Sequence, residues 1–305
     1  MSLKKTMRSI NKKLNRSDSL KSDISSPIQN DSVKSESASI DISQDSKTET
    51  ENTSIQSSNQ DEEVEDEEQE GEDDTKSNDS LLPDIKKNPP EEIATTAMNL
   101  GILFGFALGV SVFSSYKPPA FYLMSLSLFH FLEFFVTAKY NPRKVHKESF
   151  IINNGSSYTL AHTIAIIEVA IEFYFFPNFK KSYPLVKTLG VLLVIFGQIL
   201  RSWAMITAGK SFSHLISINR QDDHELVTTG IYSVFRHPSY TGFFWWAVGT
   251  QLVLVNPISI VGFILILWFF FKNRIEFEEK FLIKFFGEKY EDYRKTASVY
   301  IPFIN

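Results

Sequence analysis

The sequence predicts an all-α, multi-pass membrane protein of about six transmembrane helices, preceded by a disordered tail. Charge divides the chain. Residues 1–90 hold 12 Lys/Arg and 21 Asp/Glu, a net charge of −9, whereas residues 91–305 hold 19 and 15, a net charge of +4. Almost all of the 27 Phe lie beyond residue 100, in apolar blocks of membrane-spanning length. We therefore expect a tail (1–90), four transmembrane helices (91–208), and a region with a polar segment, a membrane hairpin and a C-terminal helix (209–305).

The tail is rich in Ser, Asp and Glu and nearly free of aromatic residues. Such a composition cannot bury enough apolar surface to offset the entropy of ordering, so it is typical of disorder. Residues 61–74 hold eleven carboxylates and no base, and their mutual repulsion keeps the chain open. The first residues are basic and allow two interpretations, a disordered arm or an amphipathic helix on anionic lipid. The helix would bury Leu3, Met7, Ile10 and Leu14.

Six apolar blocks are predicted to be membrane helices: 95–116, 120–138, 157–176, 185–208, 240–255 and 257–271. The last two are only about fifteen residues each, which is short for a full span at about 1.5 Å per residue. We expect them to form a tight helical hairpin bent at Asn256-Pro257. A hairpin returns the chain to the side that it left, so the polar residues before and after it should meet at one membrane surface.

Positive charge predicts the orientation of these helices, because Lys and Arg concentrate in cytosolic loops. Four basic residues lie in the loop 139–157 and four more follow the sixth helix. The opposite side has only Lys117, Lys180 and Lys181. We expect both termini, the loop 139–157 and the segment 209–239 to face the cytosol.

Small and polar residues inside the predicted spans also suggest contacts. Gly101, Gly105 and Gly109 form a stripe that would let another helix approach, either within the chain or in a homodimer. Polar side chains in a membrane are costly and are either functional or paired between helices, for example Glu168 or Glu172 with Arg201. The six such side chains are His130, Glu133, His162, Glu168, Glu172 and Arg201.

The absence of cysteine excludes disulfides, thiolate catalysis and Cys-ligated zinc. The six His show no zinc-type spacing, so we predict no metal site.

The polar segment and the end of the hairpin hold the candidate chemistry. Pro238 suits the first turn of a helix, whose free N–H groups favour a carboxylate or phosphate. After the hairpin, Arg274 and Glu278 lie one helical turn apart. This pair is either a solvated salt bridge worth a few tenths of a kcal/mol, or a guanidinium that holds a substrate carboxylate beside an acceptor for hydroxyls or a positive group.

A colinear series of motifs from Phe212 to Phe303 resembles the isoprenylcysteine carboxyl methyltransferases. The motifs are Gly-Lys-Ser-Phe-Ser-His at 209–214, His-Glu-Leu-Val-Thr-Thr-Gly-Ile-Tyr at 224–232, Arg-His-Pro-Ser-Tyr-Thr-Gly at 236–242, Arg-Ile-Glu-Phe-Glu-Glu at 274–279 and Phe-Phe-Gly-Glu-Lys-Tyr at 285–290. The acidic tail lies outside the resemblance.

The resemblance implies methyl transfer from S-adenosylmethionine to the C-terminal carboxylate of a prenylated cysteine, in the endoplasmic reticulum membrane. Prenylated CaaX proteins would be the substrates, and membrane lipid would surround the enzyme. Arg274 would meet the substrate carboxylate. The family usually has Gln where this chain has Ser217, so a side-chain amide contact is not expected there. By the same likeness, the cofactor pocket would contain His224, Glu225, Leu226, Val227, Tyr232, His237, Pro238, Ser239, Tyr240 and Glu278.

Three other functions compete with this one. A membrane methyltransferase acting on a phospholipid amine or small lipid would share the fold, but its cationic or neutral acceptor would gain little from Arg274. A sterol reductase using a nicotinamide cofactor has a similar C-terminal half. A non-enzymatic membrane adaptor would leave the motif series unexplained.

Overall fold

The computed structural model describes residues 86–220 and 224–304. The predicted acidic run and the basic stretch at the start of the tail lie outside these residues. Within them the chain is helical, and the only extended pairing is an isolated bridge between Phe235 and Ser298.

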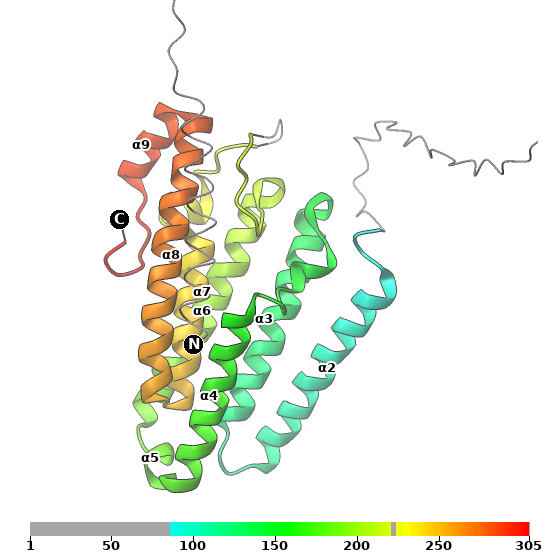
Figure 1. The fold of residues 1–305 in the computed structure, drawn as a ribbon, viewed down its shortest axis with the longest axis vertical. Helices are drawn as coiled ribbons and strands as arrows, with labels where there is room; N and C mark the ends of the chain where they lie inside the picture. Colours follow the sequence, from blue (N-terminus) through cyan, green and yellow to red (C-terminus); the bar gives the residue numbers. More distant parts are fainter. Residues whose placement is uncertain (1–85, 221–223, 305) are drawn as a thin grey trace, which may run out of the picture. The chain divides into compact units, whose positions relative to one another are not determined.

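Six long helices lie where six membrane helices were predicted (Figure 1). Among the described residues, five helices are long and apolar enough to cross a membrane; α7, with 17 residues, is the short one. The long helices are α2 (Pro90–Phe113), α3 (Pro118–Tyr140), α4 (Ser156–Phe175), α6 (Pro184–Ala208), α7 (Pro238–Leu254) and α8 (Pro257–Phe286). The shorter elements are η1 (Pro142–Lys144), η2 (Lys147–Phe150), α5 (Pro177–Lys181), η3 (Gly209–Ser211), η4 (Gly230–Ser233) and α9 (Glu288–Thr296).

Proline explains where most of these helices begin. It occupies the first helical position of α2, α3, α5, α6, α7 and α8. A helix leaves its first N–H groups without intrahelical partners, so the missing N–H of proline costs little there, while its fixed φ favours the helical turn. Proline thus marks the start of every long helix except α4, which begins at Ser156, and the bend at Asn256-Pro257 is one such start.

The predicted second hairpin arm, 257–271, is the apolar part of a longer helix. Instead of ending near residue 271, α8 is one helix of 30 residues that continues to Phe286. Good helix formers such as Lys, Arg and Glu follow the apolar part, and no proline or glycine occurs between Gly262 and Gly287. Gly287, at φ +55°, ends the helix. Arg274 and Glu278 are therefore carried by the same rigid rod as the membrane arm.

Glycines bring α6 and α7 into close contact. A Cβ added to Gly197 would lie 2.5 Å from the carbonyl oxygen of Gly242, and one added to Gly249 would lie 2.8 Å from that of Gly190. Small residues let two backbones approach in this way.

The glycine stripe on α2 behaves differently. A Cβ on Gly101, Gly105 or Gly109 would meet nothing within 4 Å. Packing of this stripe within the chain, one of the two predicted roles, is therefore wrong for the described residues.

Polar side chains fix the bend of the α7–α8 hairpin. The carboxylate of Glu168 accepts hydrogen bonds from the backbone N–H groups of Ile258 and Ser259, both 2.7 Å, at the start of α8. The fully buried Lys180 donates to the carbonyl oxygens of Leu254 (2.9 Å) and Val255 (2.7 Å) at the end of α7. Negative charge thus caps a helix N-terminus and positive charge a C-terminus, as the helix dipoles favour.

The proposed pairing of Glu168 or Glu172 with Arg201 is wrong. Glu172 lies 2.5 Å from the ammonium of Lys180, and Arg201 pairs with Glu133. Burial lowers the pKa of Lys180, and Glu172 opposes this shift. The general expectation of pairing between helices holds, but hydropathy and spacing did not identify the partners.

The two ends of the helix bundle differ. At one end lie the α7–α8 bend, α5 and the turn between α2 and α3, where the rings of Tyr116 and Phe173 stack at 4.7 Å (Figure 1). At the other end the segments 141–155 and 209–237 meet, because Asn141 donates to the carbonyl oxygen of Phe212 at 2.7 Å. The second segment also reaches the end of α8, where Arg220 donates to the carbonyl oxygen of Phe285 at 3.1 Å. The prediction that these segments share one side of the membrane agrees with this arrangement.

Candidate functional site

A cavity of about 350 Å³ opens at this second end of the bundle. Its walls come from the segment 211–215, the start of α7, the outer half of α8, and α9. This volume lies in the range of small-molecule sites. The cavity brings together Arg274 and every predicted cofactor residue except His224, namely Glu225, Leu226, Val227, Tyr232, His237, Pro238, Ser239, Tyr240 and Glu278.

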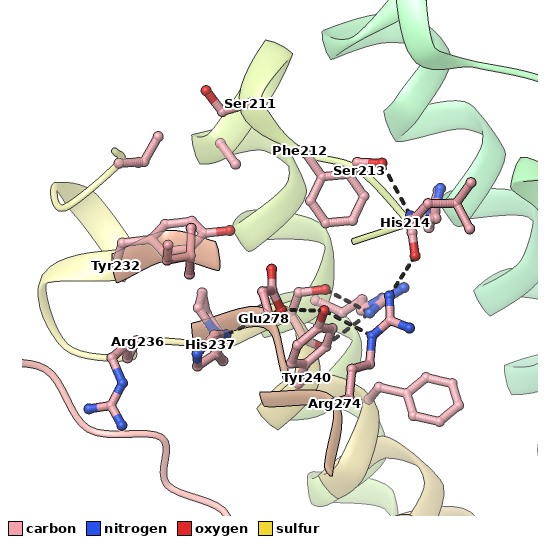
Figure 2. Close-up of a pocket in the computed structure, with 18 of the residues that line it drawn as sticks. Ser211, Phe212, Ser213, His214, Tyr232, Arg236, His237, Tyr240, Arg274 and Glu278 are labelled. Carbon is pink, nitrogen blue, oxygen red and sulfur yellow. Dashed lines mark hydrogen bonds and ion pairs between the residues drawn. The ribbon is translucent and has the colours of Figure 1, made fainter. Parts of the chain in front are cut away.

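Tyr240 links the two charged residues that the sequence placed one turn apart on α8. Its hydroxyl donates to Glu278 Oε2 at 2.6 Å and accepts from Arg274 Nε at 2.9 Å. Arg274 also donates through Nη2 to the carbonyl oxygen of His214 at 2.7 Å. Figure 2 shows Tyr240 between Glu278 and Arg274, with His214 on the Arg274 side and Tyr232 on the other. Arg274 and Glu278 are therefore coupled through a third residue and do not form a direct salt bridge.

The start of α7 is held by Glu279, which sequence reasoning did not select. This buried carboxylate accepts from Arg236 Nε at 2.6 Å and lies 3.2 Å from His237 Nε2. Arg236 also donates to the carbonyl oxygen of Ala297 at 2.7 Å, which ties the C-terminal segment to the site. His237 in turn stacks on Tyr240, with ring planes 5° apart. The position of Tyr240 thus depends on a carboxylate from the neighbouring helix.

A second buried pair supports the cavity from beneath. Arg201 on α6 donates to both oxygens of Glu133 on α3, at 2.7 and 2.8 Å, and to the hydroxyl of Ser239 at 2.6 Å. The Nε2 atom of His214 lies 3.0 Å from Glu133. Charge-assisted, bidentate bonds of this kind are the strong ones in a low-dielectric interior. The pair therefore fixes both Ser239 and the residue that holds Arg274.

The predicted residues 224 and 217 lie in a smaller neighbouring cavity of about 90 Å³. His224 and Ser217 line it together with Glu225 and Glu278, which also line the larger cavity. Of the other predicted cofactor residues, only Glu225 and Glu278 share a cavity with His224, so its predicted contact requires a ligand that reaches into the smaller cavity.

Tyrosines close the side of the cavity that faces α9. Burial raises the pKa of Tyr232 and Tyr293 above the ordinary value, so both hydroxyls stay protonated at neutral pH. The Tyr293 hydroxyl donates to the carbonyl oxygen of Tyr232 at 2.7 Å.

The described residues include no group of three His, Asp or Glu side chains that could hold a metal ion.

The loop between α3 and α4 supplies a wall that the sequence did not predict. Five of its residues line the cavity: His146, Glu148, Ile151, Asn153 and Asn154. The run Asn-Asn-Gly is typical of a turn, which gave no reason to place it at a site.

The polar residues His130 and His162 in the adjacent helices make local contacts. His130 Nδ1 donates to the carbonyl oxygen of Phe150 at 2.8 Å. His162 Nδ1 lies 2.5 Å from the Tyr122 hydroxyl.

Comparisons with known proteins point to one family. Residues 190–284 match the sequence pattern of the isoprenylcysteine carboxyl methyltransferase family. The chain is 51% identical over 236 residues to the protein-S-isoprenylcysteine O-methyltransferase of Saccharomyces cerevisiae, covering 76% of this chain and 99% of the relative. The protein of the same name from Homo sapiens is 43% identical over 226 residues, with 74% and 79% covered. The fold is similar to a solved eukaryotic intramembrane Ras methyltransferase, with a TM-score of 0.68, 40% identity, and 70% of this chain and 77% of the other covered.

Proposed function

This chain belongs to the isoprenylcysteine carboxyl methyltransferase family, and we propose from this premise that it moves a methyl group from S-adenosylmethionine to the C-terminal carboxylate of an S-prenylated cysteine. The observation that carries the proposal is the chain of contacts Arg274–Tyr240–Glu278. It places a guanidinium and a carboxylate on either side of one phenol in a single cavity.

The polar and aromatic groups of the cavity suit S-adenosylmethionine. Glu278 uses one oxygen to accept from Tyr240, and its other oxygen makes no hydrogen bond within the described part of the chain. That oxygen can accept from ribose hydroxyls or from the amino group of the methionine part. The rings of Tyr240, Phe243 and Phe271 line the cavity, and aromatic rings favour a cation next to them. When bound, S-adenosylmethionine supplies a methyl group attached to a positively charged sulfur.

Arg274 would receive the acceptor carboxylate. A carboxylate is already an anion at neutral pH, so it attacks without a general base. The protein must orient one carboxylate oxygen and exclude water, and such positioning supplies several kcal/mol of barrier lowering. The guanidinium already spends Nε on Tyr240 and one Nη2 bond on His214. Its three remaining N–H groups can orient the carboxylate.

The prenyl chain would lie against the apolar wall. Phe270 and Phe271 line the cavity, and Phe270 is also 49% exposed on the outer surface of α8, within a helix that can span a membrane. The lipid tail could therefore reach the site sideways from the bilayer, while the polar cofactor would enter from the aqueous side.

We also propose the endoplasmic reticulum as the location, with the cavity and both termini on the cytosolic side. The excess of Lys and Arg in the loop 139–157 and after the sixth predicted span supports this orientation. Protease protection of tags placed at each end of the chain in sealed microsomes tests it.

A homodimer through Gly101, Gly105 and Gly109 stays a prediction. The stripe meets no neighbour, and only 11% of the apolar window of α2 is buried. Crosslinking of single cysteines placed beside the stripe would test it, since the chain has no native cysteine.

A methyl-transfer assay with two acceptors tests the function. Membranes that contain this chain should transfer labelled methyl from S-adenosylmethionine to N-acetyl-S-farnesylcysteine and give a base-labile ester. Robust transfer to phosphatidylethanolamine, with none to the farnesylcysteine, would favour the phospholipid methyltransferase instead.

A further inference from the structure

The wall formed by the α3–α4 loop has no role in the chemistry described above. Donor and carboxylate are assigned to residues of α7, α8 and the segment 211–232, and the prenyl chain to the phenylalanines. The loop adds His146, Glu148, Asn153 and Asn154, a polar surface at the same cavity.

The loop is anchored and can serve as a fixed wall. His130 donates to the carbonyl oxygen of Phe150, and the rings of Phe150 and Phe134 stack at 4.2 Å. On its other side, the side chain of Asn88 donates to the carbonyl oxygen of Val145 at 3.0 Å. Both Val145 and Phe150 are buried.

Contacts place this wall on the Arg274 side of the cavity. Phe134 and His130 flank Glu133 on α3, and Glu133 contacts His214. The carbonyl oxygen of His214 accepts from Arg274. Because the same stretch of α3 holds both the loop and His214, the loop lies at the acceptor end. The tyrosines of the donor end belong to η4 and α9.

Two amides on this wall are available for a ligand. Asn153 and Asn154 are exposed, line the cavity, and make no side-chain hydrogen bond within the described residues. A primary amide carries two N–H donors and a carbonyl acceptor, so it can bond to both the C=O and the N–H of a peptide group.

The acceptor has a third branch that needs such a surface. The α-carbon of its cysteine carries the carboxylate, the thioether that bears the prenyl chain, and the nitrogen that leads to the preceding residue. With the first two branches assigned to Arg274 and the apolar wall, the peptide must leave along the remaining polar wall. Each residue advances it by about 3.8 Å at most, so the first peptide groups stay close to the cavity.

We propose that Asn153 and Asn154 bind the main-chain peptide groups that precede the amide of the prenylated cysteine. The enzyme would then recognise the peptide backbone of its substrate in a sequence-independent way. This inference rests on the proposed function and adds the part of the substrate that the α3–α4 loop contacts.

The test compares two acceptors with the double variant Asn153→Ala/Asn154→Ala in the full-length protein. N-acetyl-S-farnesylcysteine has only the amide of the cysteine itself, whereas the acetylated tetrapeptide Ala-Ala-Ala-(S-farnesyl)Cys has three further peptide groups and the same single charge, the acceptor carboxylate. Loss of two neutral hydrogen bonds should lower kcat/KM for the tetrapeptide about 5- to 30-fold. For the short acceptor kcat/KM should change less than about twofold, which also shows that the variant is folded.

Asn178→Ala is the matched control, because Asn178 is an exposed asparagine on α5 at the opposite end of the bundle. It should leave kcat/KM for both acceptors unchanged. An equal loss with both acceptors, or no loss with the tetrapeptide, would overturn the assignment of the two asparagines. Failure of the wild-type protein to methylate either acceptor would overturn the proposed function and this inference with it.

Discussion

The hydroxyl of Tyr240 is a single atom on which both halves of the proposed site depend. Replacing Tyr240 by Phe removes the bond to Glu278 at 2.6 Å and the bond to Arg274 at 2.9 Å, and leaves the ring in place. The stacking on His237 is preserved, and Glu279 continues to hold His237. The variant should therefore fold normally.

The size of the effect follows from these two bonds. Each has a charged partner that is only partly buried, so we take about 1 kcal/mol for each, below the value for a fully buried charge. About 2 kcal/mol corresponds to a decrease of about 30-fold in kcat/KM. Because Glu278 belongs to the donor side and Arg274 to the acceptor side, the KM values for S-adenosylmethionine and for N-acetyl-S-farnesylcysteine should both rise.

Initial rates measured while each substrate is varied in turn provide the assay. Tyr300→Phe is the matched control: Tyr300 is 54% exposed, and its hydroxyl makes no hydrogen bond within the described residues. That variant should behave as wild type. A Tyr240→Phe enzyme whose kcat/KM stays within twofold of wild type would refute the view that the phenol couples the two charged residues.

Four further predictions concern the cavity, the α7–α8 bend, the contact between α6 and α7, and the N-terminal tail. Arg274→Ala should lower kcat/KM for the farnesylcysteine about 100-fold and change S-adenosylmethionine affinity, measured by calorimetry, less than about threefold. Lys180→Met leaves the half-buried Glu172 without its partner and should cost about 2–4 kcal/mol, seen as a lower melting temperature in detergent. Gly197→Ala forces a Cβ to within 2.5 Å of the α7 backbone and should cost about 1–3 kcal/mol in the same assay. Deletion of residues 1–85, which keeps the described part intact, should leave methyl transfer largely unchanged.

Neighbouring residues supply controls for these variants. Lys181→Met changes an exposed lysine next to Lys180 and should not shift the melting temperature. Gly262→Ala, within α8, adds a Cβ where nothing lies within 4 Å, so it should be neutral or slightly stabilising. If Arg274→Ala weakened donor and acceptor binding equally, the assignment of Arg274 to the acceptor would be wrong. Inactivity of the shortened chain would show that the tail takes part in turnover.

The sequence predicted the membrane helices and ten of the residues that line the cavity, because both depend on local signals. Hydropathy located the spans, and the structure shows that proline begins all of the long helices except α4. The motif series placed Arg274 and Tyr240 together although 34 positions separate them. Local signals also misled: the visible glycine stripe on α2 has no partner in the described chain, whereas Gly197 and Gly242 approach closely without forming an evident stripe.

Long-range pairing of charges could not be predicted in the same way. Arg201 had several carboxylates available at membrane depth, and spacing alone does not select Glu133, which lies 68 positions away. Glu279 follows Glu278 directly, but the helical turn points one into the protein against Arg236 and leaves the other at the cavity. The sequence shows that Ile275 and Glu279 lie one helical turn apart, so an apolar residue shares the face of Glu279. The structure buries Ile275, and Glu279 is buried with it.

The two polar ends of the α7–α8 hairpin depend on each other. Because α8 is a continuous helix, a shift of its start by one residue would move Arg274 by about 1.5 Å along the axis and turn it by about 100°, out of reach of Tyr240. Glu168 fixes that start through two backbone N–H groups, and Lys180 fixes the end of α7. The geometry of the site at one end of the bundle is thus set partly by charges buried at the other. Glu168→Gln should therefore lower the kcat of the folded enzyme, measured well below its melting temperature. A loss of activity that is fully explained by the fraction of unfolded protein would argue against this coupling.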